Sequence, residues 1–300
     1  MNERIEKYLA ERPQARIETQ PYPLQGSNSV VYRGTWNGEP AMFKFSIRGA
    51  ARREADALKY FADTGHVPRV LDVFHDQVLV TEFVPGRSLQ ATTLSGTMRD
   101  KLVDALSTMV EQSMLDCGAD FSFVATFHGT LVETMERNPL LLSGDAFSST
   151  FKQIENNWPA LSEQTGALYF DDLGGENILL TADHVTFVDL ESVWPGNVTL
   201  QIGALVANFA ENGDSDSIAV LGALLRKLSE KHSLDWAGCM AAAYLKIWIR
   251  ICRFHRWNSW HTRDDMRLVS EADKQHVNRC GDKLRHIREF AANNWLQATL

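Results

Sequence analysis

Positions 169–180 read YFDDLGGENILL. Acids, glycines and an asparagine lie between apolar flanks. Asp172 and Asn177 are spaced so that the aspartate can orient an attacking hydroxyl and accept its proton, while the asparagine supplies an oxygen ligand for Mg²⁺. A polar turn between a buried segment and a hairpin is the alternative, because Asp and Asn are common in turns. The spacing of Asp172 and Asn177 favours a catalytic and metal-binding role over a simple polar turn.

The next segment toward the C-terminus predicts a short hairpin, with strands at 178–180 and 185–188. Asp189 follows the second strand, so closing the hairpin would bring its carboxylate beside Asn177. An aspartate and an asparagine together form a hard-oxygen site suited to Mg²⁺ carried by a nucleotide. A single aspartate after a strand can also be a turn residue or a helix cap.

Toward the N-terminus, the four residues 26–29 read GSNS and open a predicted hairpin. Small and polar residues there let backbone N–H groups approach phosphates closely. No Gly-Lys-Ser/Thr follows, so this is not a P-loop, and an ordinary turn is the alternative. Asn37-Gly38 between β-prone runs is a strong hairpin signal, because a type I′ turn needs positive φ at both central residues.

Lys44 lies between two phenylalanines in the strand after that turn, and Glu54 lies early in a helix predicted over 50–62. On an alternating strand Lys44 should point away from both phenylalanines. It could face solvent, or Glu54 could hold it to reach nucleotide phosphates, as in kinase-type sites. Two further strands are predicted at 70–74 and 78–82, followed by Pro85-Gly86.

The rest of the chain is mostly helical, with helices predicted near 98–114, 147–158, 200–212, 217–232, 236–257 and 270–296. The joint order of these features resembles the protein-kinase-like fold, specifically the aminoglycoside phosphotransferase/choline kinase family of small-molecule kinases. The resemblance runs from about Gly26 to Asn197. It implies an α+β, bilobal fold. The expected lobes are a small β-rich N-lobe at 1–84, which binds nucleotide, and a larger, mainly helical C-lobe at 85–300, which carries the catalytic loop and binds the acceptor.

The same resemblance implies the roles of individual residues, with ATP and Mg²⁺ as cofactors. Asp172 would serve the acceptor hydroxyl as the catalytic residue, and Asn177 and Asp189 would hold the metal. The expected nucleotide-binding residues are Gly26, Ser27, Asn28, Ser29, Lys44, Glu54, Glu82 and Val84.

The loop departs from the family pattern His-Gly-Asp-Leu-His-Pro-Gly-Asn. Phe170 stands for the first histidine, and Asp171 stands for the glycine. Phe170 can replace the packing of a histidine but not its hydrogen bond. The acid, amide and lysine groups needed for phosphoryl transfer remain, so a working enzyme is expected. A nucleotide-binding pseudokinase acting as an interaction module, a protein or lipid kinase, and a transferase of AMP are the alternatives.

Composition and charge limit the kinds of partner that the protein is expected to bind. The formal net charge of −8 argues against general binding to nucleic acid or anionic membranes. Lys246 and Arg250 interrupt the longest apolar run, the start has no signal core, and the four cysteines form no CxxC pair. A cytoplasmic enzyme with a small-molecule hydroxyl acceptor is therefore expected, and its oligomeric state stays open.

The acceptor has two opposing clues in the sequence. Acids near the loop, namely Asp171, Asp172, Glu176 and Glu191, suit a cationic amino sugar or amino alcohol. The basic segment 246–290 could instead receive an anionic or sugar ligand, although arginines there can form a solvated helix face.

Overall fold

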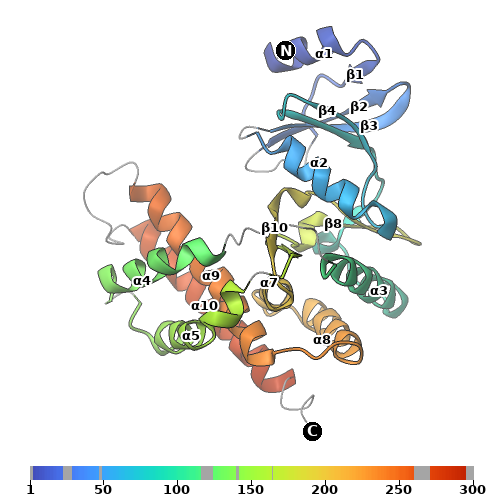
Figure 1. Ribbon diagram of the computed structural model, residues 1–300. Coiled ribbons are helices and arrows are strands. Elements are labelled where there is room, and N and C mark those ends of the chain that lie inside the picture. Colours follow the sequence, from blue (N-terminus) through green and yellow to red (C-terminus); the bar gives the residue numbers. More distant parts are fainter. Residues whose placement is uncertain are drawn as a thin grey trace. The chain divides into compact units, whose positions relative to one another are not determined.

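The computed structural model describes residues 3–22, 29–46, 49–115, 124–139, 142–163, 165–259 and 271–294. Contacts divide the chain into two units, Met1–Thr93 with Gly175–Val193 and Leu94–Gly174 with Trp194–Leu300 (Figure 1). The first unit is built on a sheet and the second mainly on helices, as the sequence predicts. The lobe boundary expected between residues 84 and 85 stays a prediction, and the contacts group 85–93 and 175–193 with the N-terminal unit.

The N-terminal unit contains a five-stranded antiparallel sheet in the order β1-β2-β3-β5-β4. Its strands are β1 (Ala15–Ile17), β2 (Ser29–Trp36), β3 (Glu39–Ser46), β4 (Val70–Phe74) and β5 (Val78–Glu82). Trp36 pairs with Glu39 across a two-residue turn, in which Asn37 and Gly38 have φ of 51° and 85°. The predicted type I′ turn is therefore confirmed in its positive φ values, and it sets the register that brings Lys44 opposite Val31.

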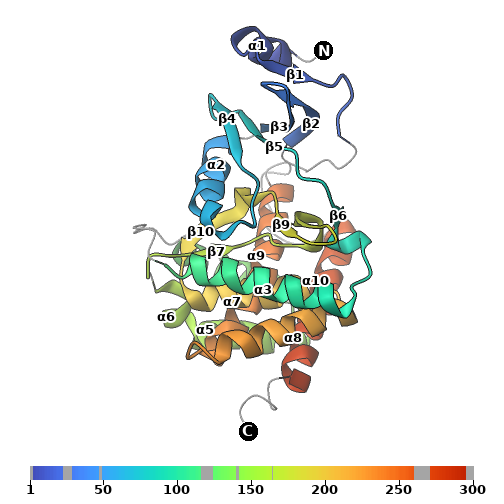
Figure 2. The same cartoon turned by 90° about the vertical axis from the view of Figure 1, so that its right-hand side faces the viewer.

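Helices α1 (Glu3–Glu11) and α2 (Ala51–Tyr60) lie on opposite sides of this sheet (Figures 1 and 2). The fully buried ring of Tyr8 on α1 contacts Phe43, Phe45 and Phe74 edge-on, at centroid distances of 6.0, 6.0 and 5.4 Å. The hydroxyl of Tyr8 donates to Asp72 Oδ2 at 3.3 Å. Aromatic contacts therefore fill one face of the sheet and leave the other face to α2.

Later segments complete the N-terminal unit. Strands β8 (Ile178–Leu180) and β9 (Val185–Phe187) form the predicted hairpin, and β6 (Arg87–Ser88) pairs with β8. Phe187 N–H donates to His66 O at 2.7 Å, which attaches β9 to the segment after α2. Short 3-10 turns precede β8 at Gly175–Asn177 and follow β9 at Leu190–Ser192.

The C-terminal unit is helical apart from β7 (Ala167–Phe170) and β10 (Val193–Gly196), which pair with each other. Its helices are α3 (Gly96–Ser113), α4 (His128–Arg137), α5 (Asp145–Asn156), α6 (Trp158–Ser162), α7 (Val198–Ala210), α8 (Ser215–Ser229), α9 (Trp236–Ser259) and α10 (Glu271–Asn294). The predicted long helices are all present, while α1, α4, α6 and the short strands β1, β6, β7 and β10 were not predicted. Apart from α1 and α4, those elements have five residues or fewer, which is too short for a clear period in the sequence.

Helices α7 and α9 form the centre of the C-terminal unit. A Cβ added at Gly203 would lie 2.2 Å from Ala242 Cβ and 2.7 Å from Cys239 O, so the glycine allows the two helices to approach closely. Trp248 on α9 is fully buried and donates from Nε1 to Thr150 Oγ1 at 3.2 Å. The core of this unit therefore lies along α9.

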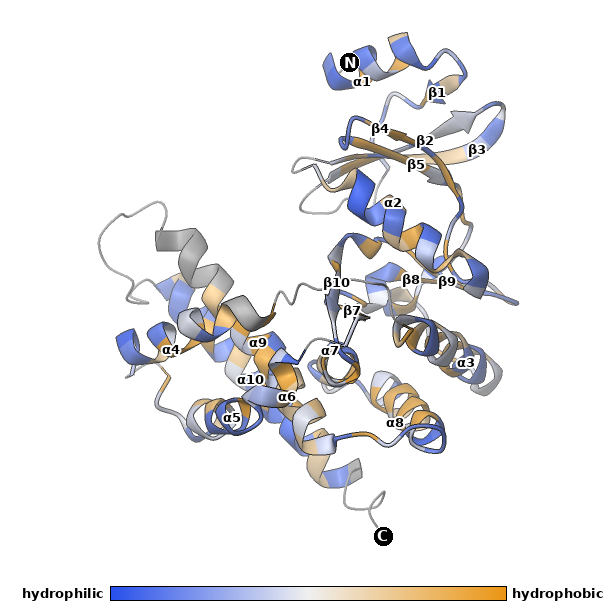
Figure 3. Ribbon diagram, viewed as in Figure 1, coloured by the Kyte–Doolittle hydropathy of each residue, from blue (hydrophilic) through white to orange (hydrophobic). Residues whose placement is uncertain are grey.

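The hydropathy of the residues agrees with the packing of helices against the N-terminal sheet. In Figure 3 the strands β4 and β5 are mainly orange, whereas α1 and α2 alternate between blue and orange. This amphipathic pattern fits helices that bury one face against a sheet. None of the described helices is both long and apolar enough to cross a membrane.

Candidate active site

Lys44 lies on the face of β3 opposite its buried phenylalanines. Phe43 and Phe45 are 0% and 5% exposed and face the aromatic core, so alternation points Lys44 to the other side of the sheet. Its side chain is only 13% exposed there. The prediction of its direction is confirmed, and the alternative that it faces solvent is wrong.

Glu54 on α2 holds this lysine. Lys44 Nζ donates to Glu54 Oε2 at 2.7 Å, and the glutamate side chain is 5% exposed. The predicted ion pair is therefore confirmed. It places a strand cation and a helix anion together inside the N-terminal unit, as the activation of a kinase-type lysine requires.

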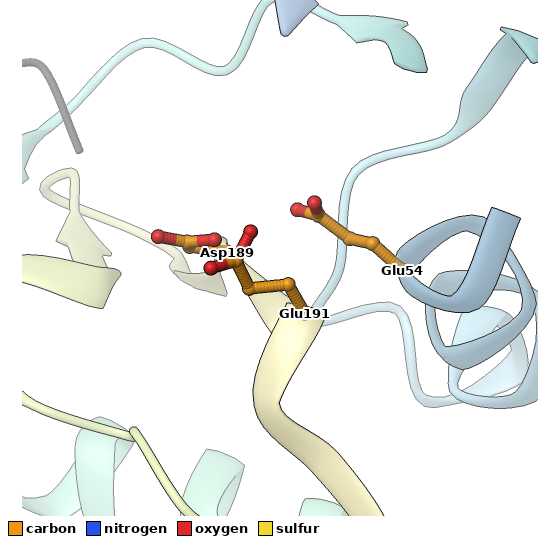
Figure 4. A group of neighbouring side chains, drawn as sticks. All are labelled: Glu54, Asp189 and Glu191. Carbon is orange, nitrogen blue, oxygen red and sulfur yellow. The ribbon is translucent and has the colours of Figure 1, made fainter. Parts of the chain in front are cut away.

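Two more carboxylates reach the same ammonium from the segment after β9. Lys44 Nζ donates to Asp189 Oδ1 and lies 3.1 Å from Glu191 Oε2. Figure 4 shows the side chains of Glu54, Asp189 and Glu191 converging, and one oxygen from each lies within 4.8 Å of the others. When all three are ionised, this acidic cluster carries two more negative charges than Lys44 balances.

Burial and charge set the protonation of this cluster. Burial raises the pKa of Glu54 to about 7, against the lowering effect of Lys44. Burial alone would lower the pKa of Lys44, but Glu54, Asp189 and Glu191 outweigh it and raise that pKa above its ordinary value. The lysine is therefore a permanent cation, whereas Glu54 titrates near neutral pH.

Asp189 has a left-handed backbone, with φ 60° and ψ 51°. Only a few per cent of residues other than glycine adopt positive φ, and those that do are often at functional sites. The β8–β9 register pairs Ile178 with Phe187, and Val188 N–H donates to Asn177 O at 2.9 Å. Asn177 and Asp189 are therefore at the same end of the hairpin, as the sequence predicts.

Asp172 follows β7 in the C-terminal unit and is exposed. The residues on either side of the Asp171-Asp172 pair, Phe170 and Leu173, are each 1% exposed. Phe170 N–H also donates to Oε1 of the buried Gln201 on α7, at 2.9 Å. Phe170 therefore supplies packing at the position where the family has a histidine. The convergence of Asp172 with Asn177 and Asp189 stays a prediction, since the residues belong to different units.

The structure describes some of the remaining nucleotide-binding candidates. Gly26, Ser27 and Asn28 lie outside the described residues, and Ser29 begins β2, where it is 4% exposed. Glu82 ends β5, and its side chain accepts from Arg69 N–H at 2.9 Å. Val84 follows as a half-buried linker residue.

The sequence predicts Glu191 as one of the acids near the loop but not as a partner of Lys44. The sequence does contain a signal, because Asp189 and Glu191 are separated by one residue at the end of a strand. Lys246, inside the apolar helix α9, was noticed only as an interruption of that helix. Its contacts depend on the tertiary packing described below.

A lysine held by a helix glutamate and a hairpin aspartate, on an α+β chain of this topology, defines a phosphotransferase of the kinase type. A family model described as the phosphotransferase enzyme family matches residues 18–239. The chain belongs to this family and is a kinase-type phosphotransferase that acts on hydroxyl groups. No curated protein sequence matches it.

Solved structures share its fold at low sequence identity. The streptomycin–ATP ternary complex of APH(2")-IIa has a TM-score of 0.64 at 14% identity, covering 95% of this chain and 98% of its own. The GDP complex of wild-type aminoglycoside 2'-phosphotransferase-IIIa has a TM-score of 0.63 at 14% identity, covering 98% and 100%. Spectinomycin phosphotransferase APH(9)-Ia, in complex with ADP and spectinomycin, has a TM-score of 0.60 at 8% identity, covering 92% and 93%. The predicted protein-kinase-like fold is confirmed.

Proposed function

We propose that this protein transfers the γ-phosphoryl group of ATP to a hydroxyl of an amino sugar, amino alcohol or sugar-like small molecule. The observation that carries the proposal is the engagement of Lys44 by Glu54 and Asp189, which are 10 and 145 residues away in sequence. A structural ion pair needs one counterion, whereas a kinase lysine needs an anchor and a neighbouring metal-binding acid. The related folds bind ATP, ADP or GDP, and two of them bind streptomycin or spectinomycin.

In this proposal Lys44 binds phosphate oxygens of the nucleotide, and Glu54 fixes its direction. The backbone of 26–29 covers the phosphates, and the linker Glu82–Val84 lies against the adenine. Within the described residues, the N–H and C=O groups of Val84 have no hydrogen-bond partner, so they are available to an adenine edge. The Glu82 N–H, by contrast, already donates to Arg69 O at 3.0 Å.

Asn177 and Asp189 are the proposed ligands of Mg²⁺. The donor set fits this ion, because amide and carboxylate oxygens are the ligands it prefers, and the acidic cluster has negative charge that Lys44 leaves unbalanced. Mg²⁺ bound with the nucleotide neutralises phosphate charge that would repel an incoming hydroxyl. The left-handed backbone of Asp189 holds its carboxylate at the end of the hairpin.

Asp172 is the proposed catalytic residue. Its carboxylate orients the acceptor hydroxyl and takes up its proton as the phosphoryl group is transferred. An exposed side chain between two buried anchors suits this role, since the acceptor must reach it while the backbone stays fixed. Catalysis of this kind depends mainly on positioning and electrostatics.

The acids near the loop support a cationic acceptor less strongly than their number suggests. Asp171 lies 3.7 Å from Lys246, and Glu191 lies 3.1 Å from Lys44, so both have partners within the protein. Asp172 and Glu176 are the exposed members. The acceptor class therefore rests on these two acids and on the related folds.

One observation favours a small acceptor over a protein substrate. Only residues 190–197 separate Asp189 from the start of α7, and they form a 3-10 turn and the strand β10. A protein kinase carries its activation loop at this place in the chain. The altered loop at 170–176 motivates the pseudokinase alternative. Measuring ADP release in the presence of acceptors distinguishes a pseudokinase from a working enzyme.

The test combines thermal shift with ADP release. The protein would be mixed with Mg-ATP, Mg-GTP or Mg²⁺ alone, and then with panels of amino sugars, amino alcohols and neutral sugars. Selective stabilisation by Mg-ATP and acceptor-dependent ADP release that Asp172→Asn abolishes are expected. Nucleotide stabilisation without release for any acceptor class would favour the pseudokinase, and equal release by Asp172→Asn would refute the role of Asp172.

A further inference from the structure

Helix α9 contains a lysine in the middle of its buried length. Lys246 is 5% exposed, and its neighbours Leu245 and Ile247 are 1% and 0% exposed. Its Nζ lies 3.7 Å from Asp171 Oδ1 and has no hydrogen-bond partner among the described residues. The carboxylate that this buried cation faces is therefore on the residue directly before Asp172.

An ammonium at this depth needs compensation. Burial lowers the pKa of Lys246, while the carboxylates of Asp171, Asp172 and Glu211 favour its charged form and Arg250 opposes it. Arg250 lies one turn further along α9 and pairs with Glu211 at the end of α7. Glu211 is therefore engaged by Arg250, and the ion-pair partner of Lys246 is the carboxylate of Asp171.

Buried residues hold both ends of this loop. Phe170 and Leu173 are each 1% exposed, and Gln201 accepts from the Phe170 N–H. The Asp171 side chain is only 14% exposed, whereas Asp172 is exposed. Fixing Asp171 toward the interior restrains the backbone from which Asp172 projects outward.

We infer that Lys246 is a positioning residue for phosphoryl transfer, which holds Asp171 in a buried ion pair and thereby fixes the loop that presents Asp172. The inference rests on the proposed function, in which Asp172 orients the acceptor. It also accounts for an acidic residue at the position where the family has glycine: the buried Lys246 ammonium faces the Asp171 carboxylate, and a glycine there would remove this counterion.

The experiment compares Lys246→Met, Asp171→Asn and the double variant with the unmodified protein. Lys227→Met is the matched control, because it removes a lysine from a surface ion pair of the same unit, 2.7 Å from Asp104. Turnover is followed as ADP release from Mg-ATP with water as the acceptor, and Mg-ADP affinity by calorimetry. Hydrogen exchange of the 169–174 amides reports on the loop directly and needs no turnover.

For Lys246→Met we expect kcat to fall on the order of tenfold to a hundredfold, because a displacement of about 1 Å has this cost. Mg-ADP affinity should stay within about twofold, since the nucleotide-binding residues are untouched. Exchange at 169–174 should accelerate. The fall in kcat caused by Lys246→Met should shrink to about twofold in the Asp171→Asn background, because the lysine acts through Asp171. Lys227→Met should change none of these quantities.

The inference fails if Lys246→Met lowers kcat equally in both backgrounds. It also fails if the variant loses only melting temperature while kcat and loop exchange stay unchanged, which is the outcome for a purely structural lysine. Asp172→Asn, measured in parallel, separates the two hypotheses. Unchanged turnover in that variant would refute the proposed role of Asp172, whereas lost turnover there with normal turnover in Lys246→Met refutes only the role of Lys246.

Discussion

Lys44 and Glu54 meet at 2.7 Å with both side chains largely buried, so one contact ties strand β3 to helix α2. Breaking a buried pair leaves a charge without compensation, at a cost of about 3–5 kcal/mol. Lys44→Met should therefore lower stability and reduce kcat/KM for ATP on the order of a hundredfold or more.

The double variant Lys44→Met/Glu54→Gln separates these two effects. Removing both charges should restore much of the melting temperature without restoring turnover. The matched control is Lys59→Met, since Lys59 is exposed on the same helix. A double variant that regained turnover would show that Lys44 is only a structural cation.

The protonation of Glu54 predicts the pH dependence. Its pKa is raised to about 7, so the free enzyme gains a proton there as the pH falls and Lys44 loses the charge of its anchor. We expect kcat/KM for ATP to fall below about pH 7 with a one-proton slope, because this profile reports the free enzyme. Glu54→Gln should remove that slope, and an unchanged profile in the variant would assign the titration to another group.

Stability should change in the opposite sense. The folded-state pKa of Glu54 lies above its ordinary value of 4.5, so ionised Glu54 destabilises the fold above about pH 7, and this cost disappears as the pH falls toward about 4.5. The melting temperature of Glu54→Gln relative to wild type should therefore be higher at about pH 8 than at about pH 5.5. A pH-independent difference between the two proteins would contradict the raised pKa.

Asp189 combines a charge with a left-handed backbone, and two substitutions separate these properties. Asp189→Asn keeps a residue type that tolerates positive φ, whereas Asp189→Ala removes the polar side-chain atoms whose local hydrogen bonds make positive φ tolerable. Both should lose turnover, and Ala should cost about 1 kcal/mol more stability than Asn. Denaturant unfolding measures the difference, and equal stability of the two variants would show that the backbone is not strained.

Gly203 tests the close packing of α7 and α9. A methyl group there would overlap the backbone and side chains of α9, so Gly203→Ala should destabilise the protein by about 1–3 kcal/mol. Gly129 in α4 has open space where its Cβ would lie, so Gly129→Ala should be neutral or stabilising by up to about 1 kcal/mol. Thermal unfolding of both variants measures this difference in stability. Equal effects of the two substitutions would contradict the close approach of α7 and α9.

The sequence predicted those parts of the site that local pattern determines. Alternation around Lys44 indicated which side of the sheet it faces, and the short hairpin placed Asn177 at the end of the strand pair with Asp189. The pairing of Lys44 with Glu54 came from the resemblance to kinase-type sites and not from local pattern. Helix α1 was not predicted, since its stability comes from burying Tyr8 against three strands rather than from its own short period. The contact of Lys246 with Asp171 could not be predicted, because it joins residues 75 positions apart through helix packing.

The residues around Lys44 come from both sides of a long stretch of chain. Residues 1–93 pack with 175–193, and 81 residues of the C-terminal unit, 94–174, lie between them. During synthesis the ribosome releases Lys44 and Glu54 long before Asp189 and Glu191. Until the β8–β9 hairpin is made, the N-terminal unit is incomplete, and Lys44 has Glu54 but lacks the two acids of the 189–191 segment. Chaperones should accordingly be engaged most while residues 94–193 are synthesised, before helices α7 to α10 follow.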